Sequence, residues 1–383
     1  MNDFARQEDF PVPDYIRSIA PYVGGKPIEE VAREFGLDPS TIVKLASNEN
    51  PLGMPDSARR AMAAAMADLG RYPDDNAFDL KAALSKKLVV GVDCITLGAG
   101  SSDILTVAAM TFAGNGGRVV YSQYGFIVYA LATQKVGAHA TVVPATPGLG
   151  HDLSAIRAAC LTSARDREAA RLVYIANPSN PTGTFVAPAE MEAFLASMPP
   201  HVVIVLDEAY SEYLAPEHRF DSTRWVARFP NLIVSHTFSK AYGLAGLRIG
   251  YAIAQPTLTD LMNRVRAAFN VNSLAQAAAI AALDDAEFLA KSHEVNRAGY
   301  AQIAGAFDAM RVDYNPSFGN FVLFKAGADF GAGARVNLAL LKRGVIVRPV
   351  ANYGLPQWLR VSIGLASENA TFLAALPEAL ASR

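Results

Sequence analysis

Apolar and polar positions follow an alternating pattern from about residue 94 to residue 254. Short runs that are apolar on both faces of a strand are separated by segments in which apolar residues recur at helical spacing. A strand that is buried on both faces belongs in a parallel sheet covered by helices. The pattern therefore predicts an α/β domain whose mostly parallel, seven-stranded sheet lies between helices, with ligands bound at the C-terminal ends of the strands. The predicted strands are residues 94–97, 118–122, 140–143, 172–176, 202–206, 232–235 and 248–253.

The pattern changes after about residue 255, where alanine-rich segments predict long helices. The elements predicted in this part are helices over 257–311, a strand at 321–324, a helix at 335–342, strands at 345–348 and 359–363, and a last helix after Ser367. Ser367 is the expected N-cap of that last helix. These elements predict a second, smaller α+β domain.

The N-terminal segment shows no periodicity before Tyr22 and carries three prolines, which predicts an extended arm. Apolar residues between Ile28 and Phe35 then fall at helical spacing, and Gly36 is placed to end that helix. We expect three parts of the chain. They are the arm and first helix (1–42), which pack with the small domain or a partner subunit, the large ligand-binding domain (43–270), and the small C-terminal domain (271–383).

The composition narrows the class of protein. Of the 383 residues, 51% are hydrophobic and 18% are charged, and the net charge of −2 provides no basic field for nucleic acid or anionic lipid. Cys94 and Cys160 lie in apolar surroundings, which predicts core packing rather than a disulfide or a metal site. The polar N-terminus does not resemble a signal peptide, and no apolar run is long enough to span a membrane. We therefore expect a soluble cytoplasmic protein.

The most specific chemistry follows the predicted strand 232–235. Thr237, Ser239 and Lys240 come in quick succession, and Arg248 lies eight residues after the lysine. A buried or cation-flanked lysine has a lowered pKa and can form an imine, whereas hydroxyls and an arginine fork suit a phosphate. An imine-forming lysine beside a phosphate suggests pyridoxal phosphate. The alternative is that Lys240 and Arg248 are surface cations, which is the default for these residue types.

Other strands also end in candidate ligands. The run Gly98-Ala99-Gly100-Ser101-Ser102-Asp103 begins a helix, so its backbone N–H groups suit an anion. The alternatives are a plain helix cap and a degraded dinucleotide loop. The run lacks the third glycine of a dinucleotide loop and the lysine of a P-loop, and a bare phosphate cup is the preferred interpretation. Tyr124 is placed to stack on a cofactor ring, although such aromatics more often belong to the core. Asn180 lies in an Asn/Pro turn, either as a donor to a ring oxygen or as simple turn chemistry.

Asp207 ends the most hydrophobic strand of the chain. A buried carboxylate requires a partner, and a protonated pyridine nitrogen would supply one, with Tyr210 within reach of the phenolic oxygen of the same ring. A magnesium ligand is the rival interpretation, but no phosphate-loop lysine accompanies it. Arg348 and Arg360 lie in or beside strands of the small domain. They are candidate anchors for a carboxylate or phosphate, or else ordinary surface arginines.

These motifs together resemble the fold-type I, class-II pyridoxal-phosphate aminotransferases, and more narrowly the histidinol-phosphate aminotransferase family. The resemblance covers nearly the whole chain. Relatives often carry an acidic residue at the position of Ser102 and a Pro-Thr pair where this chain has Ser122-Gln123, which bears on the subfamily and not on the cofactor site. The narrower resemblance depends on Pro21-Tyr22-Val23-Gly24-Gly25-Lys26-Pro27, Ala46-Ser47-Asn48-Glu49-Asn50-Pro51, Arg71-Tyr72-Pro73-Asp74 and residues 237–250, in that order.

The resemblance implies a role for each candidate residue. Lys240 would bind the cofactor covalently and shuttle a proton between the substrate Cα and cofactor C4′, while Asp207 would pair with the pyridinium. Tyr124 would stack on the ring, and Asn180 and Tyr210 would contact its hydroxyl. The phosphate would be held by Ser101, Ser102, Thr237, Ser239, Arg248 and, from the neighbouring subunit, Tyr72, which implies a homodimer with shared active sites. The substrate cleft would be lined by Tyr22, Asn48, Arg348 and Arg360, with Arg360 on the carboxylate of glutamate.

The implied reaction moves an amino group from glutamate to the cofactor and then to imidazole-acetol phosphate, giving histidinol phosphate. One cationic pocket must then accept both a carboxylate and a phosphate, which suits arginine. An aromatic amino-acid aminotransferase is the nearest alternative, because an imidazole slot also admits a phenyl ring. A threonine-phosphate decarboxylase would use the same cofactor residues. A non-catalytic pyridoxal-phosphate sensor would carry a basic DNA-binding extension, which is not evident here.

Overall fold

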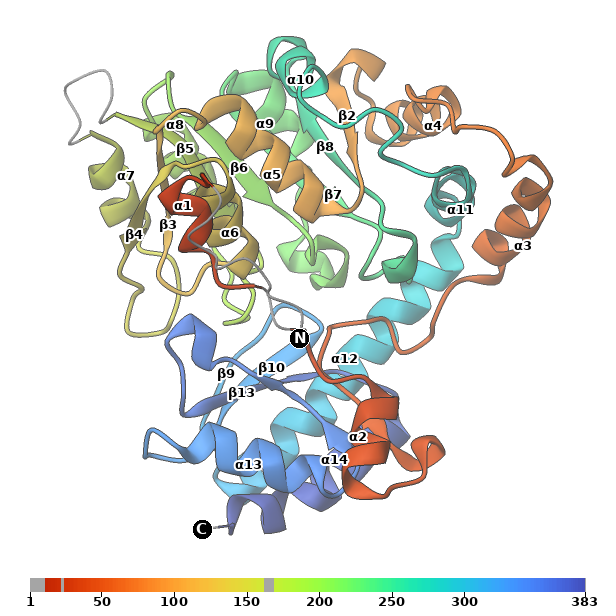
Figure 1. Ribbon diagram of the computed structural model, residues 1–383, viewed down its shortest axis with the longest axis vertical. Helices are drawn as coiled ribbons and strands as arrows, with labels where there is room; N and C mark the ends of the chain where they lie inside the picture. The colour runs from red at the N-terminus through yellow and green to blue at the C-terminus, as the bar shows by residue number, and fades with distance from the viewer. Residues whose placement is uncertain (1–10, 22–23, 162–168, 383) are drawn as a thin grey trace.

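The computed structural model describes residues 11–21, 24–161 and 169–382 of the chain. The chain forms a larger α/β lobe and a smaller α+β lobe, and the long helix α12 (Ala286–Met310) runs between them (Figure 1). Tyr22, which we expect in the substrate cleft, and the first ten residues of the arm lie outside the described residues.

A seven-stranded sheet forms the centre of the larger lobe. Its strands lie in the order β2-β8-β7-β6-β5-β3-β4, and all neighbours are parallel except β8, which is antiparallel to β2 and β7. Every strand predicted for this domain is present, with ends displaced by no more than two residues. The strands are β2 (Ile95–Gly98), β3 (Arg118–Ser122), β4 (His139–Val143), β5 (Ala170–Ala176), β6 (Val203–Asp207), β7 (Leu232–Thr237) and β8 (Gly250–Ala254).

Side chains alternate along these strands between two buried layers. In β6, for example, Ile204 and Leu206 pack on one face of the sheet, and Val203 and Val205 pack on the other. Because helices cover both faces, polar groups gather at the carboxyl ends of the strands. The first face is covered by α4 (Phe78–Leu88), α7 (Leu153–Leu161), α8 (Pro188–Ser197), α9 (Thr223–Arg228) and α11 (Ser273–Leu283), and the second by α5 (Ser101–Phe112), α6 (Ile127–Lys135) and α10 (Pro256–Asn263).

The smaller lobe is built on a four-stranded antiparallel sheet in the order β12-β13-β10-β9. Phe307, Phe324 and Phe372 meet in its core, with ring centroids 5.1 to 6.2 Å apart. This confirms the predicted α+β domain. Its elements, besides α12, are β9 (Tyr314–Asn315), β10 (Phe321–Lys325), α13 (Ala332–Leu341), β12 (Arg348–Pro349), β13 (Trp358–Ser362) and α14 (Ala366–Leu380).

The N-terminal helix packs on this smaller lobe. Helix α2 (Ile28–Phe35) ends at Gly36, whose φ of 67° is the left-handed conformation expected of a helix-ending glycine. Its Val31 pairs with Ile346 in a small apolar cluster. The two-residue strand β1 (Val43–Lys44) then runs parallel to β11 (Val345–Ile346), which fixes the following segment against the smaller lobe.

Local predictions differ from the structure at three places. The single strand expected at 345–348 is two short strands, β11 (Val345–Ile346) and β12 (Arg348–Pro349), which belong to different sheets. The arm is not wholly extended, because α1 (Asp14–Arg17) forms one helical turn against α6. Ser367 is not the N-cap of α14, which begins one residue before it. The backbone N–H of Leu365 instead donates to the Glu368 carboxylate at 2.7 Å, so a glutamate in the first turn satisfies the helix start.

Helix α11 belongs by packing to the larger lobe. It contacts α3 (Asp56–Ala65) and α4, and its Ala275 and Leu283 share a buried cluster with Ile95 of β2. The chain then passes into the smaller lobe along α12 (Figure 1). The division of the chain at residue 270 stays a prediction.

Candidate active site

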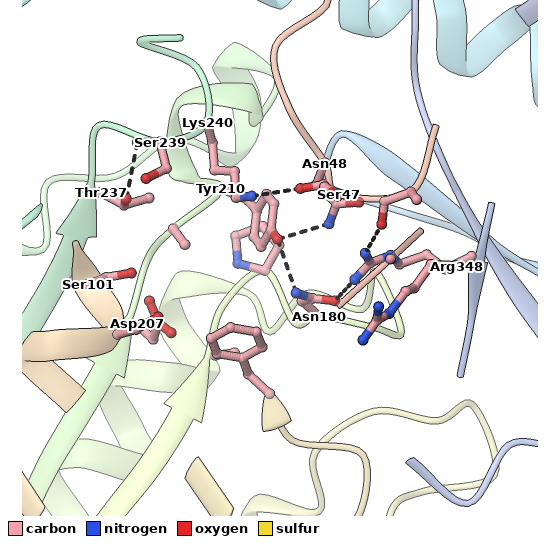
Figure 2. Close-up of a pocket in the computed structure, with 18 of the residues that line it drawn as sticks. Ser47, Asn48, Ser101, Asn180, Asp207, Tyr210, Thr237, Ser239, Lys240 and Arg348 are labelled. Atoms are coloured by element: carbon pink, nitrogen blue, oxygen red, sulfur yellow. Dashed lines mark hydrogen bonds between the residues drawn. The ribbon is translucent and has the colours of Figure 1, made fainter. Parts of the chain in front are cut away.

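A cavity lies between the two lobes, at the carboxyl ends of β5, β6 and β7 (Figure 2). It brings together every predicted site residue of the described chain except Tyr72 and Tyr124. Its lining comes from both lobes and from the segment that follows β1. The lining residues are Gly25, Ala46, Ser47, Asn48, Ser101, Ser102, Phe126, Ala176, Pro178, Asn180, Asp207, Ala209, Tyr210, Thr237, Ser239, Lys240, Arg248, Arg348, Tyr353 and Arg360.

Lys240 lies just after β7 and projects into this cavity. Its Nζ donates a hydrogen bond to the Ser47 carbonyl at 3.1 Å and lies 6.0 Å from the centroid of the Tyr210 ring. Burial, together with the nearby charge of Arg360, lowers the pKa of this amine to about 8. At pH 7 roughly a tenth of such an amine is neutral, against about three in ten thousand for an ordinary lysine. Lys240 is therefore a usable nucleophile near neutral pH.

The first turn of α5 forms one end of the cavity. Gly100 precedes this helix with a φ of 87°, and a Cβ there would collide with the Arg248 guanidinium, so only glycine fits. Arg248 Nη1 donates to Ser239 Oγ at 3.2 Å, and Thr237 Oγ1 accepts the Ser239 N–H at 3.1 Å. Arg248 forms no ion pair with another described residue. Helix N–H groups, hydroxyls and an unneutralised guanidinium therefore surround a place that suits a phosphate.

Asp207 ends β6 and is 4% exposed. Its Oδ2 accepts a hydrogen bond from the Tyr129 hydroxyl at 3.0 Å, whereas its buried Oδ1 has no hydrogen-bond partner among the described residues. Burial raises the pKa of this carboxyl to about 6, although the Tyr129 hydrogen bond acts in the opposite direction. The Tyr129 ring is fixed by stacking on Tyr174 at a centroid distance of 4.7 Å. Asp207 Oδ1 is therefore a buried acceptor for which none of the described residues supplies a hydrogen-bond donor.

The Tyr210 hydroxyl is held by two side-chain amides. It accepts from Asn48 Nδ2 at 3.0 Å and from Asn180 Nδ2 at 3.1 Å, and Asn180 is itself oriented by a hydrogen bond from Arg360 to its Oδ1. Burial raises the pKa of Tyr210 to about 12, so the phenol keeps its proton. With both acceptor positions engaged by amides, that proton is available for donation to a ligand oxygen.

Arg348 and Arg360 are direct partners on the antiparallel strands β12 and β13. Directly opposite residues project to the same face of a sheet, and like charges in such a pair are destabilising without an anion between them. Arg360 is 6% exposed, and its Nη2 donates to the Ala46 carbonyl at 2.8 Å. Its guanidinium also lies over the Phe321 ring, with Cζ 5.3 Å from the centroid. Both guanidinium groups line the smaller-lobe side of the cavity, which makes the pair a candidate second anion site.

The charges that line the cavity favour an anionic ligand. Four cationic side chains contribute to the lining, and Asp207 is the single carboxylate among the lining residues. The cationic side chains occur on both sides of the cavity, so a ligand with an anionic group at each end would be bound most favourably. The four cations are Lys240, Arg248, Arg348 and Arg360.

Tyr124 does not contribute to the lining. It packs against a small buried cluster formed by Leu323, Val350 and Leu355. The aromatic ring that lines the cavity from this segment belongs to Phe126, two residues further along the chain. The stacking role of Tyr124 stays a prediction.

Sequence reasoning also missed Phe126, Tyr129 and Tyr353. Tyr129 lies in α6, where an aromatic at helical spacing indicates only a core residue. It reaches Asp207 because its ring stacks on Tyr174 of β5, the strand beside β6, and no local motif reports that tertiary contact. Ser47 lies inside the 46–51 motif, but it contributes its backbone carbonyl. Every residue type has this group, so the sequence gives no sign of the contact.

Tyr72 lies outside the cavity of its own chain. Its side chain is 83% exposed, and its ring stacks on that of Phe269 with centroids 4.8 Å apart. Two adjoining exposed aromatic rings are typical of a surface that contacts another molecule.

Other classes of site find no support in the described part of the chain. No cluster of three or more histidine, cysteine, aspartate or glutamate side chains there could hold a metal ion. None of the helices in these ranges has the length and hydropathy needed to cross a bilayer. Cys160 is buried in the larger core and Cys94 packs against it, and both are free thiols.

The residues present fit pyridoxal phosphate. A protonated ring nitrogen would supply the donor that Asp207 Oδ1 lacks, the first turn of α5 with Arg248 suits the phosphate, and Lys240 is a partly neutral amine between them. The sheet of the larger lobe places all of these groups at one edge. Fold and site together define a pyridoxal-phosphate enzyme of fold type I.

Comparison with known proteins gives the family. The model of the aminotransferase class I and II family matches residues 40–376. Histidinol-phosphate aminotransferase 1 of Cupriavidus pinatubonensis is 63% identical over 368 residues, which cover 96% of this chain and 96% of that protein. Histidinol-phosphate aminotransferase 2 of Ralstonia nicotianae is 63% identical over 369 residues, which cover 96% of this chain and 97% of that protein.

A solved structure agrees with these relatives. Histidinol-phosphate aminotransferase from Sinorhizobium meliloti, in complex with pyridoxal-5′-phosphate, superposes with a TM-score of 0.87 at 30% identity, covering 97% of this chain and 98% of that one. The chain belongs to the class I and II aminotransferases, and within them to the histidinol-phosphate aminotransferase family.

Proposed function

We propose that this protein transfers an amino group between glutamate and imidazole-acetol phosphate, giving 2-oxoglutarate and histidinol phosphate, as a pyridoxal-phosphate-dependent step of histidine biosynthesis. The names of its relatives at 63% identity support this substrate. The observation that carries the proposal is the pair of anion sites on opposite sides of Lys240. One is the cup around Ser101, Thr237 and Ser239, and the other is the side of Arg348 (Figure 2).

Lys240 is the proposed proton carrier. Bound pyridoxal phosphate supplies an electron sink for the carbon that loses its proton. A pKa of about 8 lets the Lys240 Nζ take a proton from the substrate Cα and return it, because a base works best when its pKa lies near the working pH. The Ser47 carbonyl holds Nζ in the cavity through the hydrogen bond of 3.1 Å.

Asp207 and Tyr210 are proposed to set the electronic state of the bound ring. Tyr129 engages Asp207 Oδ2, and Oδ1 has no partner among the described residues. The carboxylate would therefore hold the ring nitrogen of the cofactor and favour its protonated form. Tyr210, held by Asn48 and Asn180, would direct its proton to the ring oxygen. The residues fix the geometry before substrate binds, so little reorganisation is needed.

The arginine pair is proposed to bind the second anion of each substrate. Glutamate presents a carboxylate, whereas histidinol phosphate presents a phosphate, and a guanidinium fork matches both. Hydrogen bonds to the Ala46 carbonyl and to Asn180 orient the Arg360 guanidinium toward the cavity. Arg348 faces it across the strands. We propose that Asn48 completes this cleft, and the same role expected of Tyr22 stays a prediction from the sequence.

We further propose that the protein is a cytoplasmic homodimer with shared active sites. The exposure of Tyr72 supports this, because its ring is presented outward and not toward the cavity of its own chain. In this arrangement its hydroxyl would contact the phosphate bound by the other subunit. The net charge of −2 supports small-molecule substrates over nucleic-acid or membrane partners.

The proposed reaction is tested by identifying its products. Purified holoenzyme is incubated with histidinol phosphate and 2-oxoglutarate, and we expect glutamate and imidazole-acetol phosphate to accumulate in equal amounts. A Lys240→Ala variant is the control and should form neither. Glutamate formed from phenylalanine or tyrosine but not from histidinol phosphate would replace the proposal with an aromatic aminotransferase. Carbon dioxide release from threonine phosphate would indicate the decarboxylase.

A further inference from the structure

A chain of hydrogen bonds joins the phosphate cup to the loop that carries Tyr72, and the proposed chemistry does not use it. It begins at Asp103 in the first turn of α5. The Oδ2 atom of Asp103 accepts the Ala99 N–H at 2.9 Å and Asn270 Nδ2 at 3.1 Å. Asn270 Nδ2 also donates to the Leu97 carbonyl at 3.0 Å. Together these contacts hold the glycine turn that gives the phosphate cup its shape.

The chain continues through Arg266, whose side chain is 9% exposed. Its Nη1 donates to Asn270 Oδ1 at 3.4 Å. Its two terminal nitrogens bind the Asp75 carboxylate at 3.0 and 2.8 Å, and Nη2 also donates to the Asp75 backbone carbonyl at 3.0 Å. The Arg266 hydrogen bonds hold the pKa of the Asp75 carboxyl below its ordinary value. A fork of this kind fixes orientation as well as distance.

The outer end of the chain is the aromatic stack. Asp75 Oδ1 accepts the Phe269 N–H at 2.5 Å, and Phe269 has a φ of 56°, which is unfavourable for an aromatic residue unless its surroundings impose it. The Phe269 ring in turn supports Tyr72, which lies three residues before Asp75. Asp75 therefore fixes both sides of the stack.

We propose that Asp75, Arg266, Asn270 and Asp103 form a positioning chain, which places the phosphate turn of one subunit and the Tyr72 offered to the other subunit in one rigid frame. None of the four lines the cavity, so they act through Ala99 and Tyr72 and do not touch cofactor or substrate. The inference rests on the proposed shared site, because Tyr72 can serve only a phosphate outside its own chain. The chain would thus connect the two phosphate sites of the dimer.

The outer half is tested on holoenzyme by the rate at which bound cofactor is released on dilution. Tyr72→Phe and Asp75→Ala should each speed release roughly tenfold, as expected for one lost hydrogen bond to a charged group. Asp75 acts largely through Tyr72. The double variant should therefore release the cofactor faster than wild type by a smaller factor than the product of the two single-variant factors. Asp329→Asn, which breaks an exposed fork with Arg335, is the matched control and should change nothing.

The inner half is tested by the ³¹P resonance of the bound cofactor phosphate, which reports the cup without requiring turnover. Asn270→Ala and Asp103→Ala should move this resonance. Asp103→Asn should leave it nearly unchanged, because an amide oxygen still accepts the Ala99 N–H. A purely structural role predicts lower thermal stability in these variants but an unmoved resonance, and that result would overturn the inner half.

The remaining outcomes are distinguishable. If the double variant releases the cofactor faster by the full product of the two single-variant factors, Tyr72 and Asp75 act independently. That result would overturn the positioning chain and leave the shared site intact. Unchanged release from Tyr72→Phe would overturn the shared site, and the outer half of the chain with it. If Asp75→Ala does not fold, Asp75→Asn takes its place, since it keeps one acceptor for the Phe269 N–H but loses the fork to Arg266.

Discussion

At the residue scale, the site depends on buried ionisable groups whose pKa values are shifted by desolvation in the direction that favours the neutral form. Burial lowers the pKa of Lys240 to about 8 and raises that of Asp207 to about 6. Both shifts concern atoms that project into the cavity or lie at its edge. An amine that is partly neutral and a carboxylate with one unsatisfied oxygen are the states that a cofactor with a carbonyl and a ring nitrogen requires.

The pKa of Lys240 predicts the pH dependence of cofactor attachment. Only neutral Nζ attacks, and the folded pKa of about 8 lies below the ordinary value of 10.5. The rate at which apoprotein binds pyridoxal phosphate covalently should therefore rise with pH up to about 8 and level off above about 9. Stopped-flow absorbance measures this rate. A rate that still climbs toward pH 10.5 would show an ordinary lysine and contradict the desolvated site.

The substitution Asp207→Asn should raise the stability of the apoprotein but slow the transamination reaction. Raising the carboxyl pKa from 3.8 to about 6 corresponds to a cost of about 3 kcal/mol for keeping Asp207 ionised at pH 7.5. Because the folded pKa is raised, stability is lost as pH rises from about 4 to 6. The variant apoprotein should therefore melt higher than wild type at pH 7.5 and equally at pH 4.

The same substitution should slow transamination by about a hundredfold or more, because a neutral amide no longer favours the protonated ring nitrogen. Calorimetry of apoprotein and steady-state kinetics of holoenzyme provide the two measurements. A variant with an unchanged melting temperature and full activity would contradict the role given to Asp207. Glu192→Gln, at an exposed ion pair with Arg228, is a suitable control.

At the element scale, the site depends on the close approach of a strand to the start of a helix. A Cβ at Gly250, the first residue of β8, would lie 2.6 Å from the Ser101 nitrogen at the start of α5. Gly100 makes the turn between β2 and α5 with a positive φ. These two glycines let the N–H groups of α5 and the Arg248 side chain share one small volume.

Gly100→Ala should release the cofactor without unfolding the protein. Its Cβ would displace the Arg248 guanidinium, and the Gly100 backbone (φ 87°, ψ 163°) lies in a region that is essentially restricted to glycine and costs about 1–3 kcal/mol for alanine. We expect weaker retention of pyridoxal phosphate and a lower melting temperature. Gly305→Ala is the matched control, because nothing lies within 4 Å of its Cβ in α12, and alanine there should stabilise by about 0.5–1 kcal/mol. A Gly100→Ala enzyme with normal cofactor retention would contradict the cup.

The elements show what the sequence can and cannot predict. Strands such as β6 were predictable because they are apolar on both faces, and the residues after them were predictable because such sheets bind ligands at one edge. Arg248 was expected inside a strand, but it ends the 3-10 turn Ala245–Leu247 with a left-handed φ of 56°, and β8 begins two residues later. The Tyr129 contact and the Arg348–Arg360 pairing arise from tertiary packing and strand register, which periodicity does not report.

At the scale of the whole molecule, the site is assembled from parts far apart in the sequence. The larger lobe contributes the amine, the carboxylate and the phosphate cup, and the smaller lobe contributes the arginine pair. The segment after β1 crosses between them and brings Asn48 to Tyr210. A second subunit is the proposed source of the last phosphate contact.

Mixed dimers test this sharing. Tyr72→Ala and Lys240→Ala should each be strongly impaired alone. In a hybrid dimer, one site carries both substitutions and the other carries neither. Unfolding and refolding an equal mixture should therefore restore about a quarter of wild-type activity, since half of the dimers are hybrids with one intact site of two. No recovery, although hybrids are detected by native mass spectrometry, would place Tyr72 outside the partner's site.

The central claim is that this cavity is built for histidinol phosphate. The most direct measurement mixes holoenzyme separately with histidinol phosphate, glutamate, phenylalanine and tyrosine, and follows the absorbance of the bound cofactor as it accepts the amino group. We predict that histidinol phosphate converts the cofactor at far lower concentration than either aromatic amino acid, with glutamate also active. Equal or better conversion by the aromatic amino acids would contradict the claim and leave the cofactor site unchanged.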